Sequence, residues 1–254
     1  MRIDSYKKLR NGLYEVAIDA KKYKIYDEII LKYNLLLSKE IDDKTLDQVL
    51  SANEEYKSYH DSLKYINIKL KTEKEIRQYL KKKEYNEKII SKTITKLKEN
   101  NLLDKNLYLT SYINDQINLT NNGPYKIQNN LINLGFREEE INKYLDFKDP
   151  IWEDKIKVII NKKSKLNRKL SNNEFKRKIK NDLYLLGYQD NYLEIIESIN
   201  LDDNKTFETQ ANKHYEKLKK KYKDNKLSYA FKNKMYSLGY DNELIESYLN
   251  KKSE

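Results

Sequence analysis

The chain of 254 residues contains no cysteine, two prolines, five glycines and two histidines. Without cysteine it forms no disulfide, no thiolate metal site and no cysteine nucleophile. The histidines, His60 and His214, lie far apart in the sequence, and there is no glycine-rich phosphate-binding loop. Because a convergent set of reactive groups is missing, we expect a non-enzymatic protein with no catalytic residue, cofactor, metal or small-molecule substrate. His214 is interpreted as a packing or surface residue.

Long apolar runs are also missing. Hydrophobic residues make up 38% of the chain and charged residues 36%, and no segment approaches the roughly 18 apolar residues that a membrane span requires. The first residues lead into a polar stretch that lacks the apolar region of a signal peptide. These features predict a cytoplasmic protein without a membrane partner. The 11% of aromatic residues, mostly tyrosine, argue against a disordered chain.

Basic residues outnumber acidic residues, and the formal net charge at pH 7 is +11. This charge favours a polyanion or an acidic protein surface as the partner. The excess is uneven, since segment 155–182 contains eleven Lys or Arg residues and only two acidic residues. A general surplus of solvated lysines explains this local concentration poorly.

The most informative pattern in the chain is a repeat. Three glycines recur at intervals of 52 residues within one phrase, in Leu134-Gly135-Phe136, Leu186-Gly187-Tyr188 and Leu238-Gly239-Tyr240. An earlier copy, displaced by 51 residues, has Glu84-Tyr85 in place of the glycine and the aromatic residue. In each copy an apolar pair at i and i+4 precedes the phrase in the same register. Such a period is typical of helical units that are too small to bury their apolar faces alone.

The repeated phrase predicts how each unit's first helix ends. Glycine is favoured just after a helix, where a left-handed backbone costs other residues about 1–2 kcal/mol. Glu84 puts this left-handed cap in question for the first copy. A base-stacking role is the alternative for the four aromatic residues that follow, but we assign them to the core between helices because they recur at one point of the unit. Tyr108, Trp152 and Phe207, near the starts of third helices, are assigned to the core as well.

Residues 2–26 differ from the rest and alternate apolar and polar side chains after Asn11-Gly12, a strong hairpin signal. A third strand is expected near Tyr23–Tyr26, and Asp27 is expected to cap a short helix. Asp42 or Asp43 would cap the next helix, and a further helix is expected from about Asn53 to Asn67.

We therefore predict a mainly α fold, with tandem three-helix repeats in an elongated curved array and a small N-terminal β-strand module. Thr72 and Glu75 form a capping box at the start of the first repeat, and Gly123-Pro124 starts the second. In the second and third repeats the helices are expected at 124–134, 138–147, 150–170, 172–186, 190–199 and 203–222. The predicted segments are a β module with a short helix (1–41), linking helices (42–70), three repeats (71–122, 123–170 and 171–223) and a truncated fourth repeat (224–254).

Motifs between Thr72 and Leu145 carry a family resemblance. They are the run Thr72-Glu73-Lys74-Glu75-Ile76-Arg77-Gln78-Tyr79-Leu80-Lys81-Lys82-Lys83, then Ile89-Ile90 and Leu97, Asn101-Leu102-Leu103-Asp104, and Gly123-Pro124-Tyr125-Lys126-Ile127. Together they resemble the RecX family, whose members regulate the RecA recombinase. The resemblance implies a protein that binds along the groove of the RecA–single-stranded-DNA filament and depresses its growth, ATP turnover and strand exchange. Family members usually have glycine at the position of Glu84 and a second acidic residue at that of Lys105.

We expect the partner to bind the first helices of the repeats, on the faces opposite their apolar pairs. The candidate residues are Lys74, Arg77, Lys81, Lys126, Lys176, Arg177, Lys180, Lys232 and Lys234. A row of cations suits phosphates, and it equally suits the acidic patches of a protein filament. The expected partners are the RecA filament and single-stranded DNA, contacted directly or within the filament. The alternative is a general nucleic-acid-binding helical repeat protein without a recombinase partner, and a third possibility is an inert scaffold.

Overall fold

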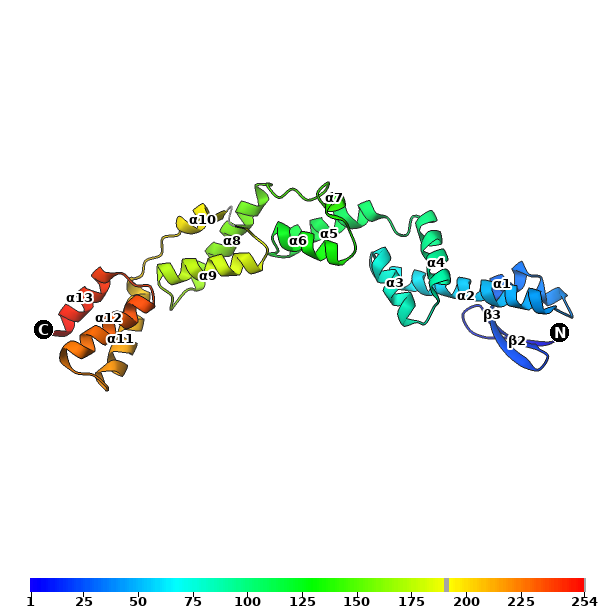
Figure 1. Cartoon of the computed structure of the whole chain (residues 1–254), viewed down its shortest axis with the longest axis horizontal. Helices are drawn as coiled ribbons and strands as arrows, with labels where there is room; N and C mark the ends of the chain where they lie inside the picture. Colours follow the sequence, from blue (N-terminus) through cyan, green and yellow to red (C-terminus); the bar gives the residue numbers. More distant parts are fainter. Residues whose placement is uncertain (190–191, 254) are drawn as a thin grey trace. The chain divides into compact units, whose positions relative to one another are not determined.

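The computed structural model describes residues 1–189 and 192–253. These residues are mainly helical, with one small antiparallel sheet near the amino terminus, as the sequence predicts (Figure 1). The chain divides into two compact units, Met1–Ser111 and Tyr112–Glu254, and the division falls within helix α5 (Lys105–Leu119). Each unit contains its own buried apolar clusters.

The amino-terminal sheet forms as the alternating pattern predicts. Strands β1 (Ile3–Lys8), β2 (Leu13–Ile18) and β3 (Lys21–Tyr26) pair antiparallel in chain order. Asn11 and Gly12 have φ angles of 59° and 71°, the geometry for which this pair is favoured in tight hairpins. The sheet packs against helices α1 (Asp27–Lys32) and α2 (Asp43–Ile66) (Figure 1). A short 3₁₀ turn, Leu35–Leu37, separates these helices.

The expected capping role of Asp27 is wrong. Tyr26 occupies the cap position, and Asp27 is the first residue of α1. The Asp27 amide instead donates to the Gly12 carbonyl (2.8 Å), so this residue still belongs to the hydrogen bonding around the hairpin. The end of the sheet therefore leads into α1 without a side-chain cap.

The two helices expected after residue 42 are one continuous helix, α2, capped by Asp42 through the Thr45 amide. Asn53 was expected to begin the second of them. Its side chain instead accepts from the Tyr26 amide and donates to the Lys24 carbonyl, both at 2.9 Å. Asn53 therefore joins α2 to strand β3 and leaves the helix uninterrupted.

The first repeat consists of α3 (Glu73–Lys82), α4 (Glu87–Glu99) and α5. The capping box is confirmed, since Thr72 accepts from the Glu75 amide while the Glu75 carboxylate accepts from the Thr72 amide. Buried Ile76 and Leu80 pack with α4 and the second half of α2. A buried hydrogen bond between the Ser58 and Thr93 hydroxyls (2.8 Å) fixes α2 against α4.

The second unit continues the pattern with shorter middle helices. The segment expected at 138–147 is helical only over Glu138–Ile141. Beyond this helix, the Asp146 carbonyl accepts from the Trp152 indole (2.8 Å). Residues 190 and 191 of the segment expected at 190–199 lie outside the described residues, and the helix there covers Leu193–Glu197. The helices of this unit after α5 are α6 (Pro124–Asn133), α7 (Glu138–Ile141), α8 (Ile151–Leu166), α9 (Asn172–Leu185), α10 (Leu193–Glu197), α11 (Asn204–Lys219), α12 (Asp224–Ser237) and α13 (Asn242–Ser253).

All four first helices end in the same hydrogen-bonded cap. The amides of Tyr85, Phe136, Tyr188 and Tyr240 donate five residues back, to the carbonyls of Leu80, Leu131, Leu183 and Met235, at 3.0–3.3 Å. This is the Schellman pattern, which requires a left-handed residue just before the donor. Gly135, Gly187 and Gly239 supply it with φ angles of 98°, 86° and 80°. Glu84 adopts the same conformation with φ of 65°, so the cap persists without glycine.

The aromatic residues after these caps are core residues, as predicted. Tyr85, Phe136, Tyr188 and Tyr240 are each at most 8% exposed. Trp152 and Phe207 are buried too, at 1% and 5%. Tyr108 is only half-buried, and its neighbour Leu109 (1% exposed) occupies the buried position, so the core assignment of Tyr108 is wrong.

Candidate binding surface on the first helices

The first helices of the second and third repeats meet end to end. The Gly123 amide, at the start of α6, donates to the Leu186 carbonyl at the end of α9 (2.7 Å). The Tyr125 amide donates to the Gly187 carbonyl (3.2 Å). Amides at the start of one helix thus satisfy carbonyls at the end of another, and the helix dipoles align head to tail.

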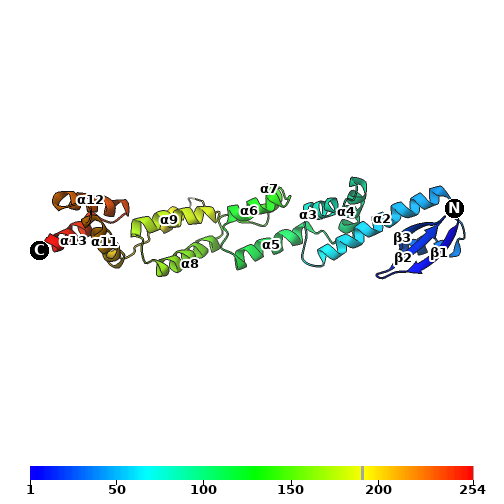
Figure 2. The ribbon, with the colours of Figure 1, turned by 90° about the horizontal axis from the view of Figure 1, so that it is seen from below.

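The third and fourth repeats meet at an equivalent junction. The Ser171 hydroxyl, at the start of α9, donates to the Leu238 carbonyl at the end of α12 (2.7 Å). The Asn173 side chain donates to the Gly239 carbonyl (3.1 Å). Within the second unit, α12, α9 and α6 therefore form one row in which each carboxyl end meets the next amino end (Figure 2).

The junctions give the recurring glycine a second role. A Cβ atom on Gly187 would lie 2.4 Å from the Lys126 backbone nitrogen, and one on Gly239 would lie 2.7 Å from the Ser171 hydroxyl oxygen. The phrase therefore terminates its own helix and also leaves room for the helix that docks on it.

The nine predicted cations do not share one face of their helices. With 3.6 residues per turn, six of them occupy one outward flank relative to the buried apolar pair. Lys126 and Lys234 lie on the other flank. Lys176 lies beside the core, its side chain 19% exposed, and donates to the Glu197 carbonyl at 2.7 Å. The six residues that occupy this flank of their own helices, called the cationic flank below, are Lys74, Arg77 and Lys81 in the first unit and Arg177, Lys180 and Lys232 in the second.

Acidic neighbours hold several of these cations in place. In the first unit, Arg77 contacts both Glu73 (2.9 Å) and Glu87 (3.1 Å), and Lys81 contacts Glu87 (3.3 Å). In the second unit, Arg177 pairs with Glu174 at 2.8 Å and Lys232 pairs with Glu246. All of these side chains are at least partly exposed, and ion pairs near the surface contribute about 0–1 kcal/mol, so an incoming anion can displace the acidic partner at little cost.

Tyrosines on the same flank are functional candidates that the sequence reasoning missed. Tyr184, Tyr229 and Tyr236 are 73%, 70% and 46% exposed. They accompany the cations at helical spacing, as Arg177-Lys180-Tyr184 on α9 and Tyr229-Lys232-Tyr236 on α12, each at i, i+3 and i+7. The signal was present in the sequence as this shared spacing, displaced by 52 residues.

The basic segment 155–182 combines structural and exposed charges. Lys155 donates to the Thr120 carbonyl (2.8 Å) at the end of α5, and burial lowers the pKa of its ammonium group. It therefore acts as a helix cap. Where α8 turns into α9, Arg168, Lys169 and Lys178 line a groove of about 510 Å³, with Phe175 among its apolar residues.

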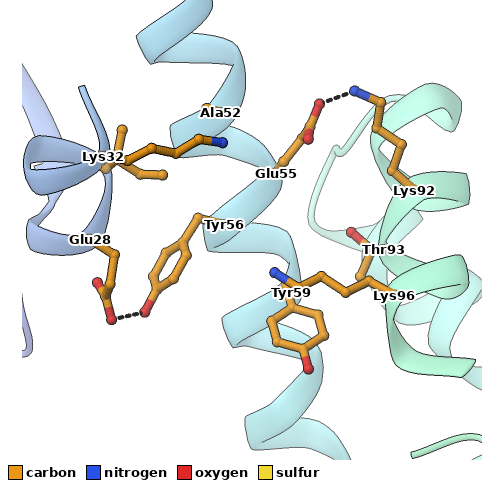
Figure 3. Close-up of a pocket in the computed structure, with 10 residues that line it drawn as sticks. Glu28, Lys32, Ala52, Glu55, Tyr56, Tyr59, Lys92, Thr93 and Lys96 are labelled. Carbon is orange, nitrogen blue, oxygen red and sulfur yellow. Dashed lines mark hydrogen bonds and ion pairs between the residues drawn. The ribbon is translucent and has the colours of Figure 1, made fainter. Parts of the chain in front are cut away.

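The first unit contains a cleft of about 320 Å³ where α2 passes between α1 and α4 (Figure 3). Its polar groups bond one another: Lys92 pairs with Glu55, and the Tyr56 hydroxyl donates to Glu28. The Lys96 ammonium lies 4.4 Å from the centroid of the Tyr59 ring. These contacts hold α1, α2 and α4 together, so we interpret the cleft as a structural feature and not as a binding site.

Neither histidine belongs to a reactive cluster. Burial and nearby Lys234, Lys213 and Lys217 lower the pKa of the His214 imidazole. His60 lies beside the rings of Tyr26 and Tyr56. Over residues 1–189 and 192–253, no three His, Asp or Glu side chains come together in a way that could hold a metal ion. Within the same ranges, no helix has the length and apolar character needed to cross a membrane.

Comparison with known proteins defines the class to which this arrangement belongs. Residues 59–97, which cover the end of α2, α3 and most of α4, match the family model described as RecX, first three-helix domain. A crystal structure of regulatory protein RecX shares the fold with a TM-score of 0.63 and 23% identity, over 78% of this chain and 99% of that one.

The similarity extends over most of the sequence. Regulatory protein RecX of Bacillus thuringiensis (strain Al Hakam) is 30% identical over 243 residues, which cover 91% of this chain and 88% of the relative. Regulatory protein RecX of Halalkalibacterium halodurans is 27% identical over 96% of both chains. The chain belongs to the RecX family of regulatory proteins.

Proposed function

We propose that the protein binds the RecA–single-stranded-DNA filament in the cytoplasm and inhibits its growth, ATP turnover and strand exchange, and so modulates recombination and DNA repair. The observation that carries this proposal is family membership, since RecX proteins resemble this chain over nearly its whole length. The net charge of +11 supports a polyanionic partner.

The row of α12, α9 and α6 supports contact with several sites on one filament. Arg177 and Lys180 lie on α9 and Lys232 lies on α12, and the end-to-end hydrogen bonds set the spacing of these helices. When one repeat binds, the effective concentration of the next repeat at its own site rises. Weak individual contacts are then sufficient to hold the filament.

The test is DNA-dependent ATP hydrolysis by RecA on circular single-stranded DNA. We expect the purified protein to inhibit hydrolysis at well below one copy per RecA protomer and to co-sediment with the filaments. Unchanged hydrolysis without co-sedimentation would reject the proposal. Salt-sensitive binding to bare DNA without any effect on RecA would favour the general nucleic-acid-binding alternative.

A matched pair of variants tests the cationic flank. Replacing Arg177, Lys180 and Lys232 by glutamine should weaken the inhibition. Replacing Lys213, Lys217 and Lys219 of α11 removes the same charge from the same unit and should leave the inhibition close to wild type. Equal loss in both variants would mean that only net charge matters.

A further inference from the structure

Three tyrosines of α9 and α12 are exposed to solvent, and one of them, Tyr236, also donates its hydroxyl to the Asn242 side chain at the start of α13. Tyr184 and Tyr229 are 73% and 70% exposed, and Tyr236 is 46% exposed. In the same unit, Tyr188 and Tyr240 are buried to 2% exposure, so tyrosine is also used there as a core residue. Single exposed aromatic residues are ordinary on protein surfaces. Three of them on one flank of two adjoining helices form an organised feature.

Rings and cations alternate along this flank. Tyr229 and Tyr236 are seven residues apart, which places them about 10 Å apart along α12, with Lys232 between them. On α9, Arg177 and Lys180 precede Tyr184 on the corresponding flank. The Ser171–Leu238 hydrogen bond joins the two helices end to end, so the two sets of rings and cations lie on consecutive helices.

We propose that this flank binds single-stranded nucleic acid by stacking unpaired bases on Tyr184, Tyr229 and Tyr236, while Arg177, Lys180 and Lys232 contact the phosphates. Exposed rings and interspersed cations are the two elements by which proteins hold single strands regardless of sequence. A duplex exposes its phosphates but keeps its bases stacked inside, so it would contact the cations and would not stack on the tyrosine rings. An acidic protein surface would likewise use the cations alone.

The acidic neighbours of these cations do not oppose the inference. Glu174 and Glu246 pair with Arg177 and Lys232, and because all four side chains are at least partly exposed, these ion pairs contribute little and exchange readily. Phosphate binding therefore replaces one weak ion pair by another, and the rings supply the part of the affinity that salt does not screen. This inference rests on the proposed function and deepens it, because it names the group of the filament that the flank contacts.

The experiment measures the anisotropy of a fluorescein-labelled dT20 strand and of an abasic strand of equal length. Wild type should bind dT20 at least tenfold more tightly than the abasic strand, since each stacked base contributes about 1–3 kcal/mol. Replacing the three tyrosines by alanine or by leucine should remove this preference. Replacement by phenylalanine, which keeps the ring, should retain it within about threefold.

A double variant with Tyr144 and Tyr222 replaced by alanine is the matched control. These tyrosines are 39% and 42% exposed in the same unit but lie outside α9 and α12, so binding should be unchanged. Equal affinity of wild type for the two strands would overturn the inference, as would full retention of the preference by the leucine variant.

RecA ATP hydrolysis with the same variants separates this inference from the proposed function. If the alanine variant binds dT20 like wild type but no longer inhibits RecA, the flank meets protein and the inference falls while the proposed function stands. If binding depends on bases but wild type leaves RecA unaffected, the proposed function falls and the inference stands.

Discussion

The first helix of the first repeat and the first helices of the later repeats are held in place by different interactions. Within the first unit, ion pairs and rings hold α3. Arg77 and Lys98 both contact Glu73, and the Lys71 ammonium lies 4.0 Å from the centroid of the Tyr65 ring. In the second unit, backbone hydrogen bonds join α6 to α9, and their formation requires a glycine at the meeting point. One repeated sequence is thus stabilised by exchangeable charges in one place and by close backbone packing in another.

The largest expected effect comes from breaking a glycine junction. Gly187→Ala adds a Cβ atom 2.4 Å from the Lys126 nitrogen and forces a left-handed alanine. We expect a loss of at least about 3 kcal/mol, from backbone strain of about 1–2 kcal/mol and two lost hydrogen bonds of about 1 kcal/mol each. Urea unfolding followed by circular dichroism measures the loss, and the Gly123 and Tyr125 amides should exchange faster with solvent.

Gly12→Ala is the control for this substitution. It also places alanine at a positive φ, of 71°, but the added atom meets the Asp27 carboxylate 3.0 Å away rather than a backbone atom. A smaller loss is therefore expected. Equal losses in the two variants would contradict the contribution that we assign to the junction.

A substitution at the junction between α9 and α12 should cause a smaller loss of stability. Ser171 is fully buried, caps α9 through the Glu174 amide and donates to the Leu238 carbonyl. Ser171→Ala removes both bonds, and we expect a loss of about 2 kcal/mol in urea unfolding. Asn86→Ala, which removes the cap of α4 within its own repeat, should cost about 1 kcal/mol. If the two substitutions cost the same, the Leu238 bond contributes nothing.

The first repeat should become more like the others when it receives their glycine. Glu84 adopts φ of 65°, a conformation that costs a residue with a side chain about 1–2 kcal/mol. Glu84→Gly should therefore stabilise the first unit by about 1 kcal/mol, since added flexibility of the unfolded chain offsets part of the gain. Glu84→Ala removes the carboxylate without relieving the strain and serves as the control. A destabilised glycine variant would show that the Glu84 side chain makes a contribution of its own.

The smallest effect concerns the charges around α3. Burial alone would raise the pKa of the Glu73 carboxyl, but hydrogen bonds from Lys98 and Arg77 outweigh it and hold this pKa below its usual value. The contribution of Glu73 to stability is therefore present above the unfolded pKa, near 4.5, and is lost as pH falls through the lower folded pKa. Glu73→Gln should cost less than about 1 kcal/mol at pH 7, and the difference from wild type should shrink between pH 5 and pH 3 in urea titrations. A constant difference over this range would refute the assignment.

Local patterns were sufficient to predict much of the fold. The Asn11-Gly12 turn, the Thr72 capping box and the buried aromatic residue of each repeat depend on residues near one another in the chain, and these predictions are confirmed. Asn53 shows why other features of the fold could not be predicted from the sequence. Its side-chain amide forms hydrogen bonds with the backbone of strand β3, and the helical period of the sequence does not encode this contact.

The candidate surface was less predictable because only some cations share a flank. Lys176 looks equivalent to its neighbours in the sequence, yet its side chain turns toward α10 and Glu197. The spacing of Tyr184 and Tyr236 was visible, but their exposure depends on which side of each helix the next helices cover. That the first helices meet end to end depends on contacts between residues more than 50 positions apart.

Because the first helices meet end to end, the number of repeats in a protein of this design can change by one whole repeat at a time. The two connections use the starts of α6 and α9 and the Leu-Gly-aromatic ends of α9 and α12, so the third repeat, which takes part in both, carries both joining parts. A duplication of the 52 residues between two equivalent glycines would add a further repeat with the same joining parts. Proteins of this design can therefore gain or lose a whole repeat through a single recombination event within their own gene.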